Sequence, residues 1–312
     1  MTKPDSHSSD HVYESISFHA MGGPCELKLY APTRGAVQAA ADAAIAEVQR
    51  IEKSYSRYRD DSIISAINNA AGKNFTAVDE ETAALLDYAH AAFEQSDGLF
   101  DITSGVLRGA WDFKSGVLPS QKRVSALRQK VGWQKVEWRP PNIRLQQAGM
   151  ELDFGGFGKE YAADAAARVC KEQGIEHGLV ELGGDIHVIG PHPDGSPWRV
   201  GLRDPREPEK AIHIISVRQG GLASSGDYER FMVVEGRRYC HILNPTTGWP
   251  VTEALAAVSV LAPLCLIAGT GATVAMLKGE QRGQEWLAAL GLPHMWVTST
   301  GELGGSLVAA GR

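Results

Sequence analysis

The strongest constraint on the fold lies in the middle of the chain, where two strand-like runs each lead into glycines. Residues 150–154 are expected to form a strand, 155–158 a glycine-rich turn and 159–172 a helix, while a second strand, 178–182, runs into 183–185. Glycine lets a backbone approach another group closely, and a helix N-terminus after such a turn favours an anion. Tight helix packing would explain the same glycines. Neither turn carries a complete P-loop or Rossmann motif, so those folds are not supported.

A second informative stretch, residues 224–250, places reactive side chains between turn residues. Glu235 and Gly236 separate two β-rich runs, 231–234 and 238–243, as a hairpin turn would. Residues 225–227 are typical of a turn, and five polar or aromatic residues are therefore expected on turns or strand ends: Ser224, Asp227, Tyr228, Arg230 and His241. Loops on a rigid scaffold often carry chemistry. A polar surface hairpin, with His241 capping a turn, is the alternative interpretation.

The remaining pattern mixes helices with strands that pair through hairpins, which predicts an α+β fold. Apolar residues recur at helical spacing from Val37 to Ile51, and Asp79 is typical of the N-cap of a helix that extends through Phe93. The other expected elements are a strand at 25–30, a short turn or helix at 63–67, a helix at 120–131, strands near Val136 and Ile143, and a ribbon of 296–298 with 301–307.

Composition narrows the functional class. The chain has 312 residues and a formal charge of −6, which gives no electrostatic footprint for nucleic acid. Its four cysteines are scattered, so a zinc site and a disulfide framework are both improbable. The N-terminus lacks the apolar segment of a secretory signal and no run is long enough to span a bilayer, so we expect a cytoplasmic protein without membrane contact. Residues 1–12 are expected to be a disordered polar tail and 13–312 a single domain.

Taken together, six sequence blocks resemble the ApbE family of FAD:protein FMN transferases and occur in the family's order. The blocks are Met21-Gly22, residues 56–68, residues 98–103, residues 152–159, residues 182–186, and residues 225–230 continuing through 241–245. The resemblance implies mixed antiparallel sheets with flanking helices, in which two lobes clasp FAD. It also implies the activity: Mg²⁺-assisted cleavage of the FAD diphosphate releases AMP, and FMN is transferred to a Thr hydroxyl of an acceptor flavoprotein. Hydrolysis of FAD to FMN and AMP would use the same site.

The resemblance assigns roles to individual residues. FAD is expected to contact Met21, Tyr58, Leu99, Phe100, Asp101, Asp153, Lys159 and the neighbourhood of Cys240. Tyr58 and Phe100 offer flat faces to a ring, and Lys159 can neutralise phosphate charge in the first turn of its helix. His241 or Asp227 could orient the incoming hydroxyl or take its proton. His241, Asp227 and Lys159 are therefore the expected catalytic residues.

The chain departs from the family at the metal site. Members of the family hold Mg²⁺ with the Asp and Thr of an Ala-Asp-x-x-x-Thr helix start, together with nearby backbone oxygens. Here Thr273 is kept, but Gly269 stands at the Asp position. The expected metal-site positions are thus Gly156, Leu266, Gly269 and Thr273, of which only Thr273 offers a side-chain ligand. Asp227 or Asp185 could restore the missing charge; otherwise this chain could be a degenerate member that binds FAD without transferring FMN.

Overall fold

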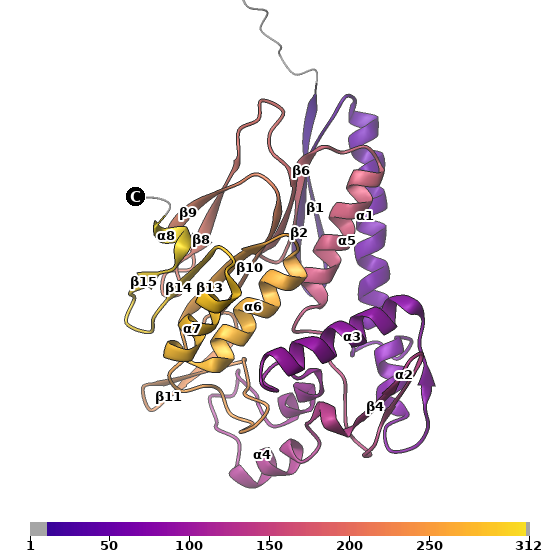
Figure 1. Ribbon diagram of the computed structural model, residues 1–312, viewed down its shortest axis with the longest axis vertical. Coiled ribbons are helices and arrows are strands. Elements are labelled where there is room, and N and C mark those ends of the chain that lie inside the picture. Colours follow the sequence, from indigo (N-terminus) through magenta and orange to yellow (C-terminus); the bar gives the residue numbers. More distant parts are fainter. Residues whose placement is uncertain (1–10, 310–312) are drawn as a thin grey trace, which may run out of the picture.

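The computed structural model describes residues 11–309, and its largest element is an eight-stranded antiparallel sheet (Figure 1). Each strand in this sheet runs antiparallel to its neighbours. The strands, in spatial order, are β1 (Val12–Ala20), β2 (Gly23–Ala31), β6 (His177–Leu182), β7 (Asp185–Gly190), β10 (Gly220–Gly226), β13 (Ala257–Ala262), β14 (His294–Val297) and β15 (Leu303–Gly304).

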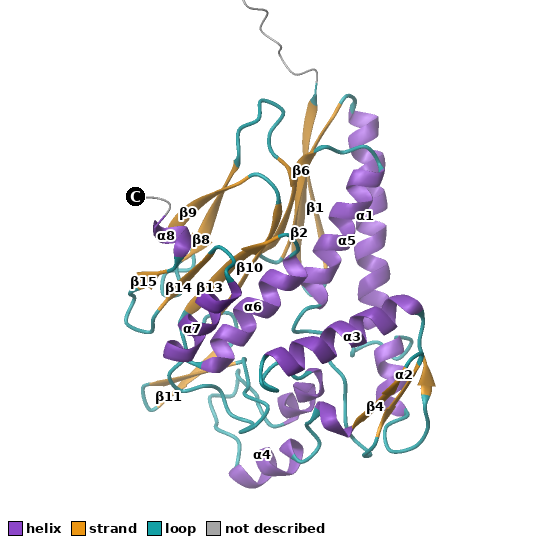
Figure 2. Ribbon diagram, in the orientation of Figure 1, coloured by secondary structure: helices purple, strands orange, loops and turns teal. Residues whose placement is uncertain are grey.

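Helices cover one face of this sheet and a hairpin covers the other (Figure 2). The helices are α1 (Arg34–Tyr55), α5 (Gly158–Glu172), α6 (Cys265–Lys278) and α7 (Glu280–Leu290), and the hairpin is β8 (Trp198–Arg203) with β9 (Ala211–Val217). Successive side chains of a strand point to opposite faces of the sheet. The same strands therefore contribute to the core under the helices and to the core under the hairpin. On β6, for example, Leu179 packs with Trp198 of the hairpin, whereas Val180 joins the core under α1 and α5.

Smaller elements gather beyond the end of α1, below the sheet in Figure 1. They are α2 (Ile63–Asn69), α3 (Glu80–Gln95), the 3₁₀ helix η1 (Ile102–Gly109), α4 (Gln121–Arg128), the 3₁₀ helix η2 (Trp133–Lys135) and a sheet of β3 (Thr76–Ala77), β5 (Asn142–Leu145) and β4 (Val136–Arg139). The hairpin of β11 (Phe231–Val234) and β12 (Arg237–Cys240) lies at the lower edge of the large sheet, and α8 (Ser306–Ala309) follows β15. Among the described residues, no helix combines the length and apolar character needed to cross a membrane.

The predicted fold class is confirmed: antiparallel sheets with flanking helices make an α+β protein. Several local predictions also hold. The carboxylate of Asp79 accepts a hydrogen bond from the backbone N–H of Thr82 at 2.8 Å, as expected of the N-cap of α3. The predicted hairpin is β11 with β12, although its second strand ends at Cys240, three residues earlier than expected.

The strand predicted at residues 150–154 is wrong, because this segment is irregular. Its backbone groups bond to side chains and to a 3₁₀ helix instead of to a neighbouring strand. The amide side chain of Asn68 accepts from the N–H of Leu152 at 2.7 Å and donates to its carbonyl at 3.0 Å, and the N–H of Asp153 donates to Ile102 at 2.8 Å.

The predicted turn at residues 225–227 and the predicted N-terminal tail also need correction. Residues 225 and 226 complete β10 instead of forming a turn, and Asp227 is the first residue beyond that strand. The tail predicted at residues 1–12 lies outside the described residues up to residue 10, and Val12 already belongs to β1. This first strand, which pairs along its whole length with β2, was not predicted at all.

Candidate active site

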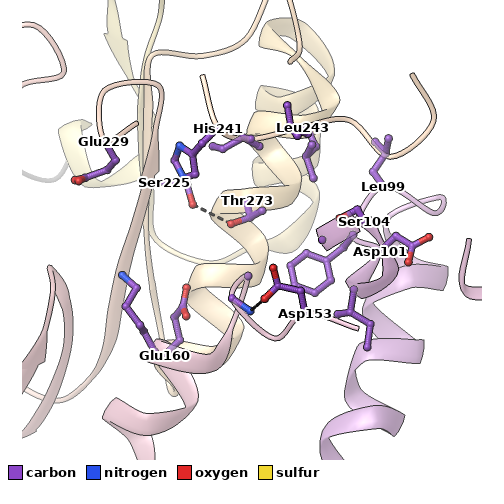
Figure 3. A pocket seen from close by; sticks show the side chains of 18 of the residues that line it. Leu99, Asp101, Ser104, Asp153, Glu160, Ser225, Glu229, His241, Leu243 and Thr273 are labelled. Carbon is purple, nitrogen blue, oxygen red and sulfur yellow. Dashed lines mark hydrogen bonds between the residues drawn. The ribbon is translucent and has the colours of Figure 1, made fainter. Parts of the chain in front are cut away.

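A cavity opens where the loop before η1, the turn before α5, the sheet and α6 meet (Figure 3). Residues 99–108 supply one wall and the glycine turn with the start of α5 a second, including Gly156 and Lys159. The cavity is completed by the start of β7, the end of β10, residues 241–243 after β12, and Thr273 with Leu277 of α6. The cavity therefore draws on segments that lie far apart in the sequence.

One permanent cation of the cavity is Lys159, in the first turn of α5. Its Nζ lies 3.0 Å from Oδ2 of Asp185 at the start of β7, and the side chain of Asp185 is almost wholly buried. Burial alone lowers the pKa of Lys159, but Asp185 and Glu160 raise it by more, so the pKa lies above its ordinary value. Lys159 is thus held charged and fixed in position, as a group that neutralises phosphate must be.

Glu160, the next residue, points from α5 toward the turn of α6 that carries Thr273 (Figure 3). It is only 8% exposed, and its Oε2 is buried without a hydrogen-bond partner among the described residues. Burial, followed by the charge of Asp185, raises the pKa of Glu160. Sequence reasoning did not identify this residue, because an acidic side chain in the first turn of a helix is usually explained by the helix dipole.

His241 follows β12 and is held by its backbone N–H, which donates to the carbonyl of Arg230 at 2.9 Å. Its Nδ1 is buried and has no partner within the described part of the chain. Burial first, and then the charges of Arg230 and Arg108, lower the pKa of His241 to about 4. The imidazole is therefore neutral near pH 7 and has a nitrogen free to accept a proton.

Thr273 lies in the middle of α6 and is linked to the sheet, since its hydroxyl is 2.9 Å from that of Ser225 on β10 (Figure 3). The start of α6 is fixed by Asp164 of α5. The carboxylate of Asp164 accepts from the backbone N–H groups of Cys265 at 2.8 Å and Leu266 at 3.0 Å. Two donors at the helix N-terminus are thereby satisfied by one side chain, and the helix that carries Thr273 is anchored to α5.

Asp153 and Asp101 line the cavity, but both make several internal hydrogen bonds. Asp153 accepts from Arg57 at 3.2 Å, pairs with Arg108 at 3.0 Å and accepts from the N–H of Gly155 at 2.8 Å. These bonds hold the glycine turn against η1.

The carboxylate of Asp101 caps the start of η1 by accepting from the N–H and hydroxyl of Thr103 at 2.8 and 2.7 Å. It also accepts from the N–H of Trp133 at 3.1 Å. In the structure both carboxylates therefore position the loops of the cavity.

The structure brings eight predicted site residues to the cavity and leaves six outside its lining. The lining includes Leu99, Phe100, Asp101, Asp153, Gly156, Lys159, His241 and Thr273. Those outside it are Met21, Tyr58, Asp227, Cys240, Leu266 and Gly269.

Tyr58 is 77% exposed, whereas Cys240 is buried next to His241. Asp227 is engaged elsewhere, because its two oxygens accept from Arg206 at 2.6 and 3.0 Å.

A family model described as the ApbE family matches residues 21–296. The chain belongs to the ApbE family. A relative from Treponema pallidum (strain Nichols), named FAD:protein FMN transferase, is 31% identical over 281 residues, which cover 84% of this chain and 78% of the relative. The crystal structure of the ApbE protein from Thermotoga maritima matches with a TM-score of 0.86 at 28% identity, over 96% of this chain and 98% of that one. The flavin transferase ApbE from Vibrio cholerae matches with a TM-score of 0.84 at 26% identity, over 95% and 97%.

The cavity also contains Arg108, Ser225, Glu229 and Glu160, to which the sequence and the ApbE resemblance gave no role. Arg108 lies on η1, a 3₁₀ helix that the sequence pattern did not predict. For Ser225, the polar run in which it lies was interpreted as a turn. Ser225 and Glu229 lie in one of the blocks that resemble the ApbE family, but nothing in the sequence assigned either side chain to the site.

Proposed function

We propose that this protein is an FAD:protein FMN transferase that joins FMN to a threonine of an acceptor flavoprotein. The observation that carries the proposal is the cavity itself, in which a fixed cation, a glycine turn at a helix start and a neutral histidine converge. The ApbE relatives that bear the name of this activity support it.

The proposed reaction breaks one bond and forms one. The hydroxyl oxygen of the acceptor threonine attacks the phosphorus on the FMN side of the FAD diphosphate, and the bond from that phosphorus to the oxygen of the AMP half breaks. AMP leaves with the electron pair, and FMN remains attached through a phosphoester. His241 accepts the hydroxyl proton at Nδ1, a buried atom to which no residue among 11–309 is hydrogen-bonded. Lys159 neutralises charge on the diphosphate, and the first turn of α5, which no side chain caps, favours the same anion.

The residues around Thr273 fit a divalent cation. Glu160 offers a buried carboxylate whose Oε2 has no partner within residues 11–309, and Thr273, which also lines the cavity, offers a hydroxyl. Both are hard oxygen donors of the kind that Mg²⁺ prefers. When bound there, Mg²⁺ would stabilise negative charge that develops on the phosphates.

FAD binding is proposed for the lining residues 99–101, with Phe100 against Gly156 and the diphosphate toward Lys159. The predicted contributions of Met21, Tyr58 and Cys240 stay predictions, and so does a catalytic role for Asp227. We further infer that residues 13–312 act as one domain, because the cavity needs segments from residue 99 to residue 277. The cytoplasmic location expected from the sequence also stays a prediction.

The proposal is tested by following both halves of FAD. The protein is incubated with FAD, MgCl₂ and a flavoprotein domain that carries a target threonine, and AMP, free FMN and protein-bound flavin are separated by chromatography. We expect AMP and acceptor-bound flavin in equal amounts, and neither product with an acceptor in which that threonine is replaced by Ala. Free FMN with AMP, independent of the acceptor, would identify a hydrolase instead, and the absence of AMP would overturn the proposal.

A further inference from the structure

We infer that Glu160 on α5 supplies the carboxylate of a divalent-cation site that it forms with the Thr273 hydroxyl on α6. Glu160 thereby replaces the carboxylate that Gly269 lacks. The inference rests on the proposed function, for which a divalent cation is expected, and it assigns the site to a residue on a different helix.

The first argument is spatial. A Cβ atom placed on Gly269 would lie 2.5 Å from Oε1 of Glu160, 2.6 Å from its Cγ and 2.9 Å from its Cδ. Such distances are far inside van der Waals contact. The Glu160 side chain therefore occupies the volume into which any side chain at position 269 would extend. The glycine is required by this arrangement, because the two side chains exclude each other.

The second argument concerns the unpaired oxygen. A buried carboxylate is costly unless hydrogen bonds or a cation compensate it. The Oε2 atom of Glu160 has no such partner among the described residues, although Lys159 precedes it in the chain. The ammonium group of Lys159 is committed to Asp185, at 3.0 Å. A cation bound beside Oε2 would supply the direct partner that this oxygen lacks among the described side chains.

Other carboxylates are less suited to this role. Asp227 forms a two-pronged ion pair with Arg206 and does not line the cavity. Asp185 lines the cavity, but its carboxylate holds Lys159. Glu160 is thus the acidic side chain of the cavity that has a buried oxygen without a hydrogen-bond partner in the described part of the chain.

The donor set selects the kind of ion. A carboxylate and a hydroxyl favour Mg²⁺ or Mn²⁺ over metals that prefer sulfur or imidazole. The backbone oxygen of Leu266, expected as a further ligand, accepts a hydrogen bond from the Tyr88 hydroxyl at 3.0 Å and is not part of the cavity lining. With so few protein ligands, water and the FAD diphosphate would complete the coordination, and affinity should rise when FAD is present.

The test is a titration of the full-length protein with MnCl₂, followed by electron paramagnetic resonance, with and without FAD. Glu160→Gln keeps the shape of the side chain and removes its charge. We expect this variant to bind Mn²⁺ at least about tenfold more weakly than the unchanged protein. Glu181→Gln is the control, because Glu181 is a half-buried glutamate that lies on β6 outside the cavity lining. It should bind Mn²⁺ as the unchanged protein does. Equal Mn²⁺ affinity in Glu160→Gln and the control would overturn the inference.

A pair of further variants tests the exclusion between positions 160 and 269. Gly269→Asp alone should lower the melting temperature, because its Cβ collides with Glu160. Adding Glu160→Ala should restore the melting temperature and also Mn²⁺ binding, since the new carboxylate then faces Thr273 one turn away on the same helix face. If Gly269→Asp is as stable as the unchanged protein and binds Mn²⁺ more tightly, Glu160 is not the ligand.

Metal binding and FMN transfer are separate readouts, so the two proposals fail separately. Glu160-dependent Mn²⁺ binding without AMP release would leave this site in place and reject the transferase proposal. AMP release with unchanged Mn²⁺ affinity in Glu160→Gln would do the reverse.

Discussion

Lys159 and Asp185 join α5 to β7 through an ion pair of 3.0 Å at the wall of the cavity. The Asp185 side chain is almost completely buried, whereas that of Lys159 is 39% exposed and faces the cavity. The buried carboxylate thus holds the cation at the place where the diphosphate is proposed to bind. This ion pair is therefore expected to contribute both to the stability of the fold and to the reaction. Substitutions of Lys159 and Asp185 can separate these two contributions.

Replacing Lys159 by Met should impair both stability and activity. Asp185 would then be buried without its partner, at a cost of about 2 kcal/mol, which is below the range for fully buried pairs because Lys159 is partly exposed. AMP release should fall by about two orders of magnitude, the usual effect of removing one group that stabilises developing charge. Urea unfolding and an AMP assay measure the two effects. In the double variant Lys159→Met with Asp185→Asn, stability should recover while AMP release stays low; recovery of both would show that Lys159 acts only structurally.

The pH dependence of stability should report on His241. Its pKa in the folded protein is about 4, against about 6.5 for an unperturbed histidine. Above pH 6.5 the imidazole is neutral in both states; as the pH falls below 6.5, the unfolded state takes up a proton that the folded state excludes. This residue should therefore cost about 2 kcal/mol of unfolding free energy between pH 7 and pH 5.

Urea unfolding of the unchanged protein and of His241→Phe at both pH values isolates this contribution. The loss between pH 7 and pH 5 should be smaller in the variant by that amount. Equal losses in the two proteins would mean that the histidine titrates normally in the folded state.

Asp164 should be important for activity although it lies outside the cavity lining. Asp164→Ala removes both hydrogen bonds to the first turn of α6, which we expect to cost about 2 kcal/mol. Because α6 carries Thr273, AMP release should fall as well, even at temperatures where the variant is fully folded. Asp79→Ala is the control: it removes the N-cap of α3 and should cost about 1 kcal/mol while AMP release is retained. If both variants keep full AMP release, the position of α6 does not limit the reaction.

Local sequence signals predicted the elements whose ends are fixed by their own residues. The N-cap of α3 and the turn between β11 and β12 are examples, since a capping carboxylate and a Glu-Gly turn act over a few residues. The segment 150–154 has the apolar character of a strand, but its backbone bonds to Asn68 and η1, and no strand within residues 11–309 pairs with it. Strand β1 was not predicted, because most of its residues alternate between exposed and half-buried positions and its apolar periodicity is weak.

In the candidate site, too, features set by local sequence could be predicted and features set by tertiary packing could not. Residues directly after the glycine turn and the hairpin, such as Lys159 and His241, could be selected from the sequence and its family resemblance. The relation between Glu160 and Gly269 could not, because 109 positions of chain separate them and only the packing of α5 on α6 brings them together. A missing carboxylate in one motif therefore gave no indication of where its replacement lies.

The most direct test of the proposed FMN transfer is the intact mass of the acceptor flavoprotein after incubation with this protein, FAD and MgCl₂. We predict a mass increase equal to one FMN less one water, localised to a single threonine by peptide fragmentation, with one AMP released for each acceptor modified. An acceptor of unchanged mass would contradict FMN transfer, whether FAD is consumed in the reaction or remains intact.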